Sequence, residues 1–209
     1  MTGPLGIAER AKVLGASTLY EAAKCDCALD PGIRAIWSGA AIAAPAYPLT
    51  CSPGDNLSIH IALERAPRGS VLVVATGGFL AGYWGEVLTV AAQTSGIAGL
   101  VVDGGVRDVA AIARRRFPVF AAGVSVRGTI KASAPAVGAP LRMSGVRVAP
   151  GDLVVADDDG VVVLRADEAA RIVAAGEDRQ AREAEMMADL ERGATTLTLL
   201  GLADWRERV

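Results

Sequence analysis

The sequence predicts an α/β fold in which helices cover a central parallel or mixed sheet and a β-rich second half follows. Apolar runs of strand length alternate with helical patterns between residues 70 and 121, which is typical of parallel strands joined by helices. After residue 125 closely spaced turn residues replace this periodicity, and a long helical pattern returns near residue 168. We therefore expect one domain over residues 1–209, with terminal helices flanking a core of about residues 40–165.

The N-terminal part is expected to contribute two helices and one extended segment. Pro53-Gly54-Asp55 predicts a turn before the second helix. Helical spacing and an Ala- and Pro-rich stretch predict, in order, a helix over residues 7–24, a strand or extended segment over 39–50 and a helix over 56–66.

The centre of the sequence has the most regular pattern. It predicts three buried strands separated by two helices, in the order 70–75, 85–95, 98–102, 107–115 and 118–121. Ligands of such sheets bind outside the carboxyl ends of the strands. Residues that follow these strands are therefore the first candidates for a functional site.

Two strands and a long helix are expected in the second half. Strands over residues 153–156 and 161–164 flank Asp157-Asp158-Asp159-Gly160, whose spacing fails the EF-hand pattern and favours a hairpin turn. Asp167 is placed to cap a helix over residues 168–192. A helix of this length at the end of a small domain often packs on another subunit.

Composition and charge exclude several classes of protein. Hydrophobic residues make up 52% of the chain, which favours a filled core, and a net charge of −2 gives no basis for nucleic-acid binding. No apolar run approaches the roughly 18 residues of a membrane span, and the N-terminus lacks a signal-peptide layout. The three cysteines do not have zinc-site spacing, so reduced thiols in a cytoplasmic protein are expected.

Glycines follow the first central strand at positions 77, 78 and 82. Such glycines let the backbone approach an anion, and the helix that follows offers free N–H groups. Two alternatives stay open from the residues alone: a tight turn with glycines for packing, or the nucleotide- or S-adenosylmethionine-binding loop of a transferase, with Asp103 on the ribose. The spacing Gly77-Gly78-x-x-x-Gly82 is not the dinucleotide-binding Gly-x-Gly-x-x-Gly.

Arg107-Asp108 follows the second central strand, at the expected start of a helix. An Asp there satisfies free backbone donors, but the charge of an Arg opposes the helix dipole and requires a negative partner. Glu86, Asp103, Asp108 or a bound carboxylate could supply that charge. Carboxylates and one guanidinium at neighbouring strand ends suit a divalent cation with a small 2-oxo acid, because together they can neutralise an enolate as it forms.

His60 is the only histidine of the chain. It falls on an expected helix, where we predict a histidine whose hydrogen bonds are satisfied. A catalytic triad or a His-rich metal site is excluded unless His60 is used, and no P-loop or His-Glu-x-x-His motif is present.

Gly82-x-x-Gly85-Glu86, followed after twenty residues by Arg107-Asp108, resembles the Asp/Glu-x20-Arg-Asp signature of the RraA-like proteins. These include the 4-hydroxy-4-methyl-2-oxoglutarate (HMG) aldolases. The similarity covers most of residues 50–165. It implies a swivelling β/β/α fold, assembled as a homotrimer or homohexamer. It also implies a Mg²⁺- or Mn²⁺-dependent class II pyruvate aldolase, often with oxaloacetate decarboxylase activity.

The resemblance also implies roles for the motif residues. By this resemblance, Asp108 stands at the position of the direct metal ligand. Arg107 stands at the position of the residue that contacts the 2-oxo oxygen. Glu86 stands where the family has an acid that holds a metal-bound water and transfers protons. Asp103 is a further catalytic candidate at the same strand ends.

Substrate contacts are implied for the neighbouring backbone. The amides of Val87 and Leu88 would receive the pyruvate carboxylate, with Gly82 and Gly85 beside them. Aldolase members use a glutamate from the C-terminal helix of a neighbouring subunit. Glu183 and Glu185 are the candidates here, although the segment departs from the usual Lys-Glu pattern.

We therefore expect a lyase that cleaves or decarboxylates a small 2-oxo acid through a pyruvate enolate, without nucleic-acid or membrane partners. A regulator of ribonuclease activity that acts by surface binding is the second hypothesis, because some similar proteins are described in that role. A nucleotide- or S-adenosylmethionine-binding transferase is the third.

Overall fold

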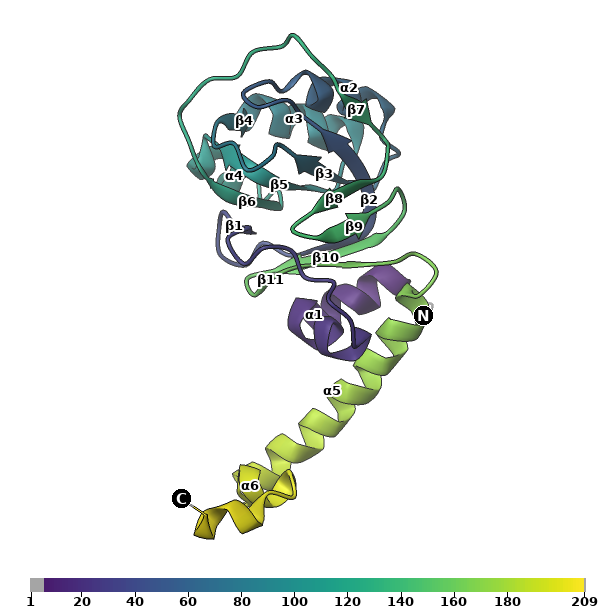
Figure 1. Ribbon diagram of the computed structural model, residues 1–209, viewed down its shortest axis with the longest axis vertical. Helices are drawn as coiled ribbons and strands as arrows, with labels where there is room; N and C mark the ends of the chain where they lie inside the picture. The colour runs from purple at the N-terminus through teal and green to yellow at the C-terminus, as the bar shows by residue number, and fades with distance from the viewer. Residues whose placement is uncertain (1–5, 209) are drawn as a thin grey trace.

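The computed structural model describes residues 6–208 (Figure 1). Its helices are α1 (Ile7–Ala23), α2 (Leu57–Arg65), α3 (Glu86–Ser95), α4 (Val109–Arg114), α5 (Ala169–Glu191) and α6 (Thr196–Leu199), followed by the 3-10 helix η1 (Ala203–Glu207). Its strands are β1 (Arg34–Ala35), β2 (Ile42–Thr50), β3 (Val71–Ala75), β4 (Gly82–Trp84), β5 (Gly99–Val106), β6 (Val119–Val124), β7 (Ala136–Val137), β8 (Leu141–Met143), β9 (Val146–Val148), β10 (Leu153–Asp157) and β11 (Gly160–Leu164).

Nine strands of the described chain form one mixed sheet. Its order is β1-β6-β5-β3-β2-β10-β11, with β4 beside β5 and β7 beside β2. Neighbours from β2 to β6 pair in parallel, whereas β1, β10 and β11 pair antiparallel. Arg34 of β1 reaches the opposite edge, where its Nη1 donates to the carbonyl of Asp159 at 3.3 Å, so the sheet curls until it is nearly closed. The predicted α/β class with a mixed sheet is confirmed.

The central strands are continuously apolar because both faces of the sheet are covered. Along β3, Leu72 and Val74 pack into a core with α2, α3 and α4, whereas Val71 and Val73 pack on the opposite face with β10 and β11. All four side chains are fully buried. A strand buried on both faces does not alternate polar and apolar residues, which explains the uninterrupted apolar run in the sequence.

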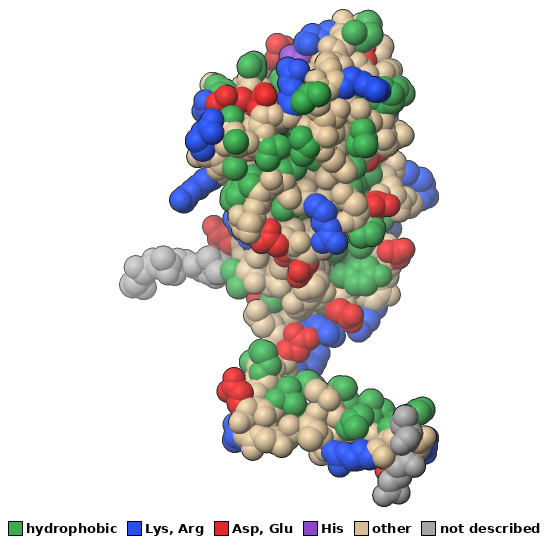
Figure 2. Space-filling model, turned by 90° about the vertical axis from the view of Figure 1, so that its left-hand side faces the viewer, with side chains coloured by type: hydrophobic (Ala, Val, Ile, Leu, Met, Phe, Trp, Pro, Cys, Tyr) green, Lys and Arg blue, Asp and Glu red, His purple; other side chains and the backbone are tan. Residues whose placement is uncertain are grey.

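The terminal helices α1 and α5 cover the β10–β11 hairpin, at the end of the molecule opposite to α2 and α3 (Figure 1). Beyond this contact, the chain over residues 180–208 extends away from the body as a projecting arm (Figure 1). Hydrophobic side chains are exposed on this arm (Figure 2), and Leu200 and Trp205 are each more than half exposed.

Strand β4 replaces part of the loop that the glycine pattern predicts. It pairs with the end of β5, which extends to Val106, so Asp103 lies within a strand and not at its end. Gly105 makes this pairing possible, because a Cβ there would lie 2.7 Å from the carbonyl oxygen of Ala81. Gly77 and Gly78 do lie in a turn with positive φ, whereas Gly82 lies in β4 and marks close contact with the backbone of Ser125.

No helix of the described chain is long and apolar enough to cross a membrane. All three cysteines are free. Burial raises the pKa of the Cys27 and Cys51 thiols to about 12, so both stay protonated near neutral pH and neither is a candidate nucleophile.

Candidate functional site

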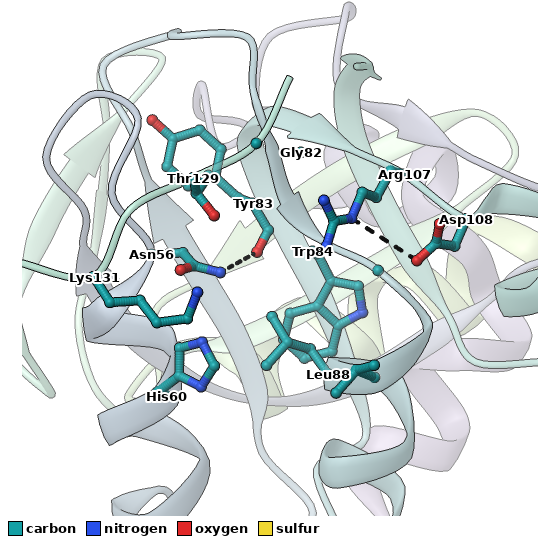
Figure 3. A pocket seen from close by; sticks show the side chains of 13 residues that line it. Asn56, His60, Gly82, Tyr83, Trp84, Leu88, Arg107, Asp108, Thr129 and Lys131 are labelled. Carbon is teal, nitrogen blue, oxygen red and sulfur yellow. Dashed lines mark hydrogen bonds and ion pairs between the residues drawn. The ribbon is translucent and has the colours of Figure 1, made fainter. Parts of the chain in front are cut away.

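A cavity of about 270 Å³ opens between β4, the end of β5 and the starts of α2 and α3, and the loop over residues 128–131 closes its remaining side (Figure 3). This volume is below the usual range for drug-sized ligands, so the cavity suits a small metabolite. Its wall includes six of the predicted site residues, namely Gly82, Gly85, Val87, Leu88, Arg107 and Asp108.

Arg107 and Asp108 lie side by side at one end of the cavity. Helix α4 begins at Val109, two residues later than predicted, so the pair belongs to the turn before it. Asp108 has a left-handed backbone with a φ of 57°, which Asp tolerates better than most residues. Nε of Arg107 lies 3.9 Å from Oδ2 of Asp108, and both side chains are about half exposed. The guanidinium thus has a negative partner.

Gly82 and Gly85 make room for this pair. A Cβ on Gly82 would lie 3.1 Å from Cδ of Arg107. A Cβ on Gly85 would lie 3.1 Å from Cγ of Arg107 and 2.5 Å from Oδ2 of Asp108. A larger residue at position 85 would displace both charged side chains, whereas one at position 82 would also clash with the carbonyl oxygen of Ser125, 2.8 Å away.

The N-terminus of α3 opens into the same cavity. The N–H group of Glu86 donates to Oδ2 of Asp108 at 3.0 Å, which fixes the helix start against the turn. The N–H groups of Val87 and Leu88 have no hydrogen-bond acceptor within residues 6–208, and both residues line the cavity. Free N–H groups in the first turn of a helix form an anion site, because the helix dipole adds positive charge there.

A buried network holds this helix start in place. The indole of Trp84 is fully buried and stacks on Phe117, with ring centroids 5.9 Å apart. Its Nε1 donates to Oγ1 of Thr89 at 2.8 Å, and that hydroxyl donates to the carbonyl of Gly85 at 3.0 Å. Packing and hydrogen bonds beneath the start of α3 therefore hold its free N–H groups in place.

The other two predicted carboxylates are placed differently. Glu86 is not among the residues that line the cavity, and its Oε1 lies 3.0 Å from Nη2 of Arg115. Asp103 accepts hydrogen bonds from the N–H and Oγ1 of Thr76, the latter at 2.8 Å, and lines a separate hollow. The expectation that Asp103 shares one crevice with Arg107 is therefore not met.

Asn56 and His60 also line the cavity, and neither is among the predicted site residues. Asn56 is only 5% exposed, and its Nδ2 donates to the carbonyl of Tyr83 at 3.0 Å. Oδ1 of Asn56 is buried and has no hydrogen-bond partner within the described chain. The same holds for Nε2 of His60. The prediction of a satisfied histidine is therefore wrong. The available signal is the four-residue spacing, which places His60 about one turn after Asn56, the N-cap of α2.

The loop that carries Lys131 is tied to the start of α2. Oδ2 of Asp55 accepts hydrogen bonds from the N–H groups of Ala132 and Ser133, at 2.8 and 2.7 Å. On the other side of Lys131, the N–H and carbonyl of Ile130 both bond to backbone just before α2. These contacts hold Lys131 in the cavity wall.

Asp55 makes this tether sensitive to acid. The N–H group of Leu57, followed by those of Ala132 and Ser133, lowers the pKa of the Asp55 carboxyl. Its stabilising effect is therefore present above the unfolded pKa of about 4 and is lost as the pH falls through the lower folded pKa. We expect Asp55→Asn to lower the thermal midpoint at pH 7, and its difference from wild type to shrink between about pH 5 and about pH 3.

Thermal unfolding of wild type and D55N across this pH range checks the expectation. Asp178→Asn, at an exposed position on α5, is the matched control and should unfold like wild type at each pH. If the thermal midpoint of D55N stays below that of wild type by the same amount down to about pH 3, the charge of Asp55 is not the source of the stabilisation.

One carboxylate at the cavity wall, that of Asp108, is of the kind that binds hard divalent cations. Asp108 supplies a carboxylate at the wall, and its Oδ1 has no partner within residues 6–208. Among the described residues, no group of three or more His, Cys, Asp or Glu side chains is arranged to hold a metal. Mg²⁺ and Mn²⁺ are often bound through one or two carboxylates, with water and substrate oxygens completing the shell. Asp108 is the residue that could hold such an ion.

A nearly closed mixed sheet with a small polar cavity at two strand–helix junctions defines the class, an α/β protein. The chain belongs to the RraA-like family, whose model, described as Aldolase/RraA, matches residues 16–163. The matched span contains the whole wall of the cavity. The resemblance seen in the sequence is therefore confirmed.

Individual relatives are similar over much of the chain. The chain is 33% identical over 141 residues to a Halalkalibacterium halodurans protein named "Putative 4-hydroxy-4-methyl-2-oxoglutarate aldolase". The aligned segment covers 67% of this chain and 67% of that protein. It is similar to an uncharacterized protein from Pseudomonas syringae pv. tomato, with a TM-score of 0.83, 26% identity and full coverage of both chains. RraAS2 of Streptomyces coelicolor, an unusual member of the RNase ES inhibitor RraA family, has a TM-score of 0.76 and 28% identity, covering 89% of this chain and all of its own.

Proposed function

We propose that the protein is a divalent-metal-dependent carbon–carbon lyase that releases pyruvate from a small 2-oxo acid. Its substrates would be 4-hydroxy-2-oxo acids of the HMG type, oxaloacetate, or both. One observation carries the proposal: a guanidinium, a carboxylate and two free helix N–H groups meet around a cavity of metabolite size. Membership in the RraA-like family and the name of the H. halodurans relative support the same chemistry.

The start of α3 would bind the substrate carboxylate. The N–H groups of Val87 and Leu88 would donate to its oxygens, and the helix dipole would add attraction. The C2 oxygen would then face Arg107, whose side chain lies against Gly82 and beside Asp108. A guanidinium in this position stabilises the negative charge that develops on the C2 oxygen as the C3–C4 bond breaks.

Asp108 would hold Mg²⁺ or Mn²⁺ through Oδ1, since Oδ2 already accepts the N–H group of Glu86. Such a cation, when bound, polarises the oxygens of a 2-oxo acid and supplements the charge of the guanidinium. The same N–H contact keeps the Asp108 carboxylate oriented, so the chain holds its own part of the site ready before any ligand enters.

Both reactions break the C3–C4 bond and leave its electron pair in the enolate of pyruvate. In the retro-aldol reaction the C4 hydroxyl loses its proton as the C4 carbonyl forms, whereas oxaloacetate loses CO₂. A proton added to C3 then gives pyruvate. We assign these proton transfers to Glu86, acting through water, because it stands between the wall residues Gly85 and Val87 and its carboxylate is oriented by Arg115.

A second subunit would complete the site. Glu183 and Glu185 lie on α5, at the end of the molecule opposite to α2 and α3, so neither side chain can reach the cavity of its own chain (Figure 1). We infer a homotrimer or homohexamer in which the projecting arm brings one of these carboxylates to a neighbouring cavity. Glu183 already pairs with Arg179 at 2.8 Å, whereas Glu185 has no ion pair within the described chain, which favours Glu185.

A coupled assay for pyruvate release tests the proposal. With Mg²⁺ or Mn²⁺ present, we expect turnover of oxaloacetate, of HMG or of both, and loss of turnover when EDTA removes the cation. Adding back the cation should restore the rate, which separates metal removal from denaturation. A folded protein that releases no pyruvate from either substrate with either cation would overturn the proposal.

Regulation of a ribonuclease is the second candidate, because the similar protein RraAS2 belongs to a family named for RNase ES inhibitors. Such a role would use the surface of the molecule, so it would survive the loss of Arg107. Stoichiometric binding of a ribonuclease, retained by Arg107→Ala and accompanied by no pyruvate release, would favour this function over the lyase.

A further inference from the structure

The cavity has a second polar end that the proposed chemistry does not use. Lys131, His60 and Asn56 converge there, across the cavity from Arg107 and Asp108 (Figure 3). Lys and Arg side chains also gather around the histidine on the surface of this part of the molecule (Figure 2). The wall therefore carries a positive side chain at each of its two ends.

Two buried polar atoms at this end lack partners. Oδ1 of Asn56 and Nε2 of His60 are both buried without a hydrogen bond in the described chain. An unsatisfied buried polar atom costs free energy that a bound ligand can recover. Burial, with the charge of Lys131 as a smaller cause, lowers the pKa of His60, so the imidazole is neutral near pH 7 and carries a proton on only one nitrogen.

The position of Lys131 is built into the fold. Its neighbours on both sides are hydrogen-bonded to the segment that begins α2, through Ile130 on one side and through Ala132 and Ser133 on the other. These bonds hold the backbone of the loop around Lys131 against the start of α2, next to the N-cap residue Asn56. This arrangement keeps an ammonium group next to the two unsatisfied atoms (Figure 3).

We propose that Lys131, together with His60 and Asn56, binds the distal carboxylate and the neighbouring hydroxyl of a dicarboxylic 2-oxo acid. Lys131 and an Nε2–H tautomer of His60 would donate to the carboxylate, and Oδ1 of Asn56 would accept the C4 hydroxyl. Lys131 would thus be the residue that selects dicarboxylic over monocarboxylic substrates. The inference rests on the proposed function, because it takes the Arg107 end of the cavity to bind the 2-oxo group.

Binding of two matched ligands tests this assignment without turnover. 2-Oxoglutarate and 2-oxopentanoate have the same length and differ only in the distal carboxylate, and neither has a C4 hydroxyl to permit retro-aldol cleavage. By calorimetry with Mn²⁺ present, we expect wild type to prefer 2-oxoglutarate by about 10- to 100-fold, the effect of one charge-assisted hydrogen bond. Lys131→Met should remove most of this preference and leave the affinity for 2-oxopentanoate unchanged.

Two further variants make the result specific. Lys131→Arg keeps the charge and should retain part of the preference, whereas Lys12→Met, at an exposed position on α1, should bind both acids like wild type. Equal affinity of wild type for the two acids, or an equal loss of both in K131M, would overturn the inference. Pyruvate release without ligand preference would refute this inference alone, and ligand preference without pyruvate release would refute the lyase alone.

Discussion

Replacing Arg107 with Ala should lower kcat/KM for pyruvate release by about 10²–10³-fold, the usual cost of removing one donor to a developing oxyanion. The reason is its position in the cavity wall, beside Asp108 and against Gly82, where no other guanidinium of the described residues lines the cavity. Because the charge on the C2 oxygen grows as the bond breaks, kcat should fall more than KM rises. Steady-state kinetics on oxaloacetate and HMG measure both constants.

The controls for Arg107 separate charge from geometry. Arg107→Lys keeps the charge but loses the planar fork, so its rate should lie between those of wild type and R107A. Arg142→Ala removes an exposed guanidinium on β8 and should leave the kinetics unchanged. Turnover of R107A close to that of wild type would remove Arg107 from the mechanism.

Asp108→Asn should weaken Mn²⁺ binding by about 10²-fold or more, since even a residue that only orients a metal ligand is worth 10- to 100-fold. Asn adopts the left-handed backbone of this position as readily as Asp, and its side-chain oxygen can still accept the N–H group of Glu86. The fold should therefore persist while the negative charge is lost. Calorimetric titration with Mn²⁺, without substrate, measures this loss independently of turnover.

Thermal unfolding without metal provides the check on D108N. Its midpoint should match that of the wild-type apoprotein, and added Mn²⁺ should raise the midpoint of wild type but not of D108N at the same concentration. Unchanged Mn²⁺ affinity in D108N would place the metal elsewhere and would contradict the assignment.

Much of the fold could be predicted because both faces of the central strands are buried. Runs such as Val71–Ala75 are apolar throughout, and the helices between them have clear spacing, so this alternation predicts parallel strands joined by helices. Strand β4 could not be predicted in the same way. Its Gly82 signals a turn in the sequence, whereas in the folded chain it permits close contact with the backbone of Ser125 and with the side chain of Arg107.

The site could be predicted where chemistry and local sequence coincide. Arg107 and Asp108 are adjacent in sequence and follow a strand, so their meeting at a strand end required no knowledge of tertiary contacts. The sequence predicts that Asp103 joins them, but Asp103 lies within β5, where the pairing with β6 shifts register between Val102 and Gly105, and its carboxylate accepts hydrogen bonds from Thr76.

Local sequence patterns do not predict that Lys131 lines the cavity. It comes from a loop without periodicity. Hydrogen bonds from the backbone of that loop to the Asp55 carboxylate, and between that loop and the backbone just before α2, more than seventy residues earlier, hold it at the cavity. The four-residue spacing of Asn56 and His60 indicates that they lie near each other at the start of α2. It does not indicate that they face the same cavity as Arg107. The second end of the cavity is therefore a product of tertiary structure.

The most direct test of the central claim is a crystal structure of the protein with Mn²⁺ and pyruvate. We expect anomalous density for the metal at Asp108, the pyruvate carboxylate at the N–H groups of Val87 and Leu88, and the C2 oxygen at Arg107. Mn²⁺ bound at another carboxylate, or pyruvate bound outside this cavity, would contradict the proposed lyase site.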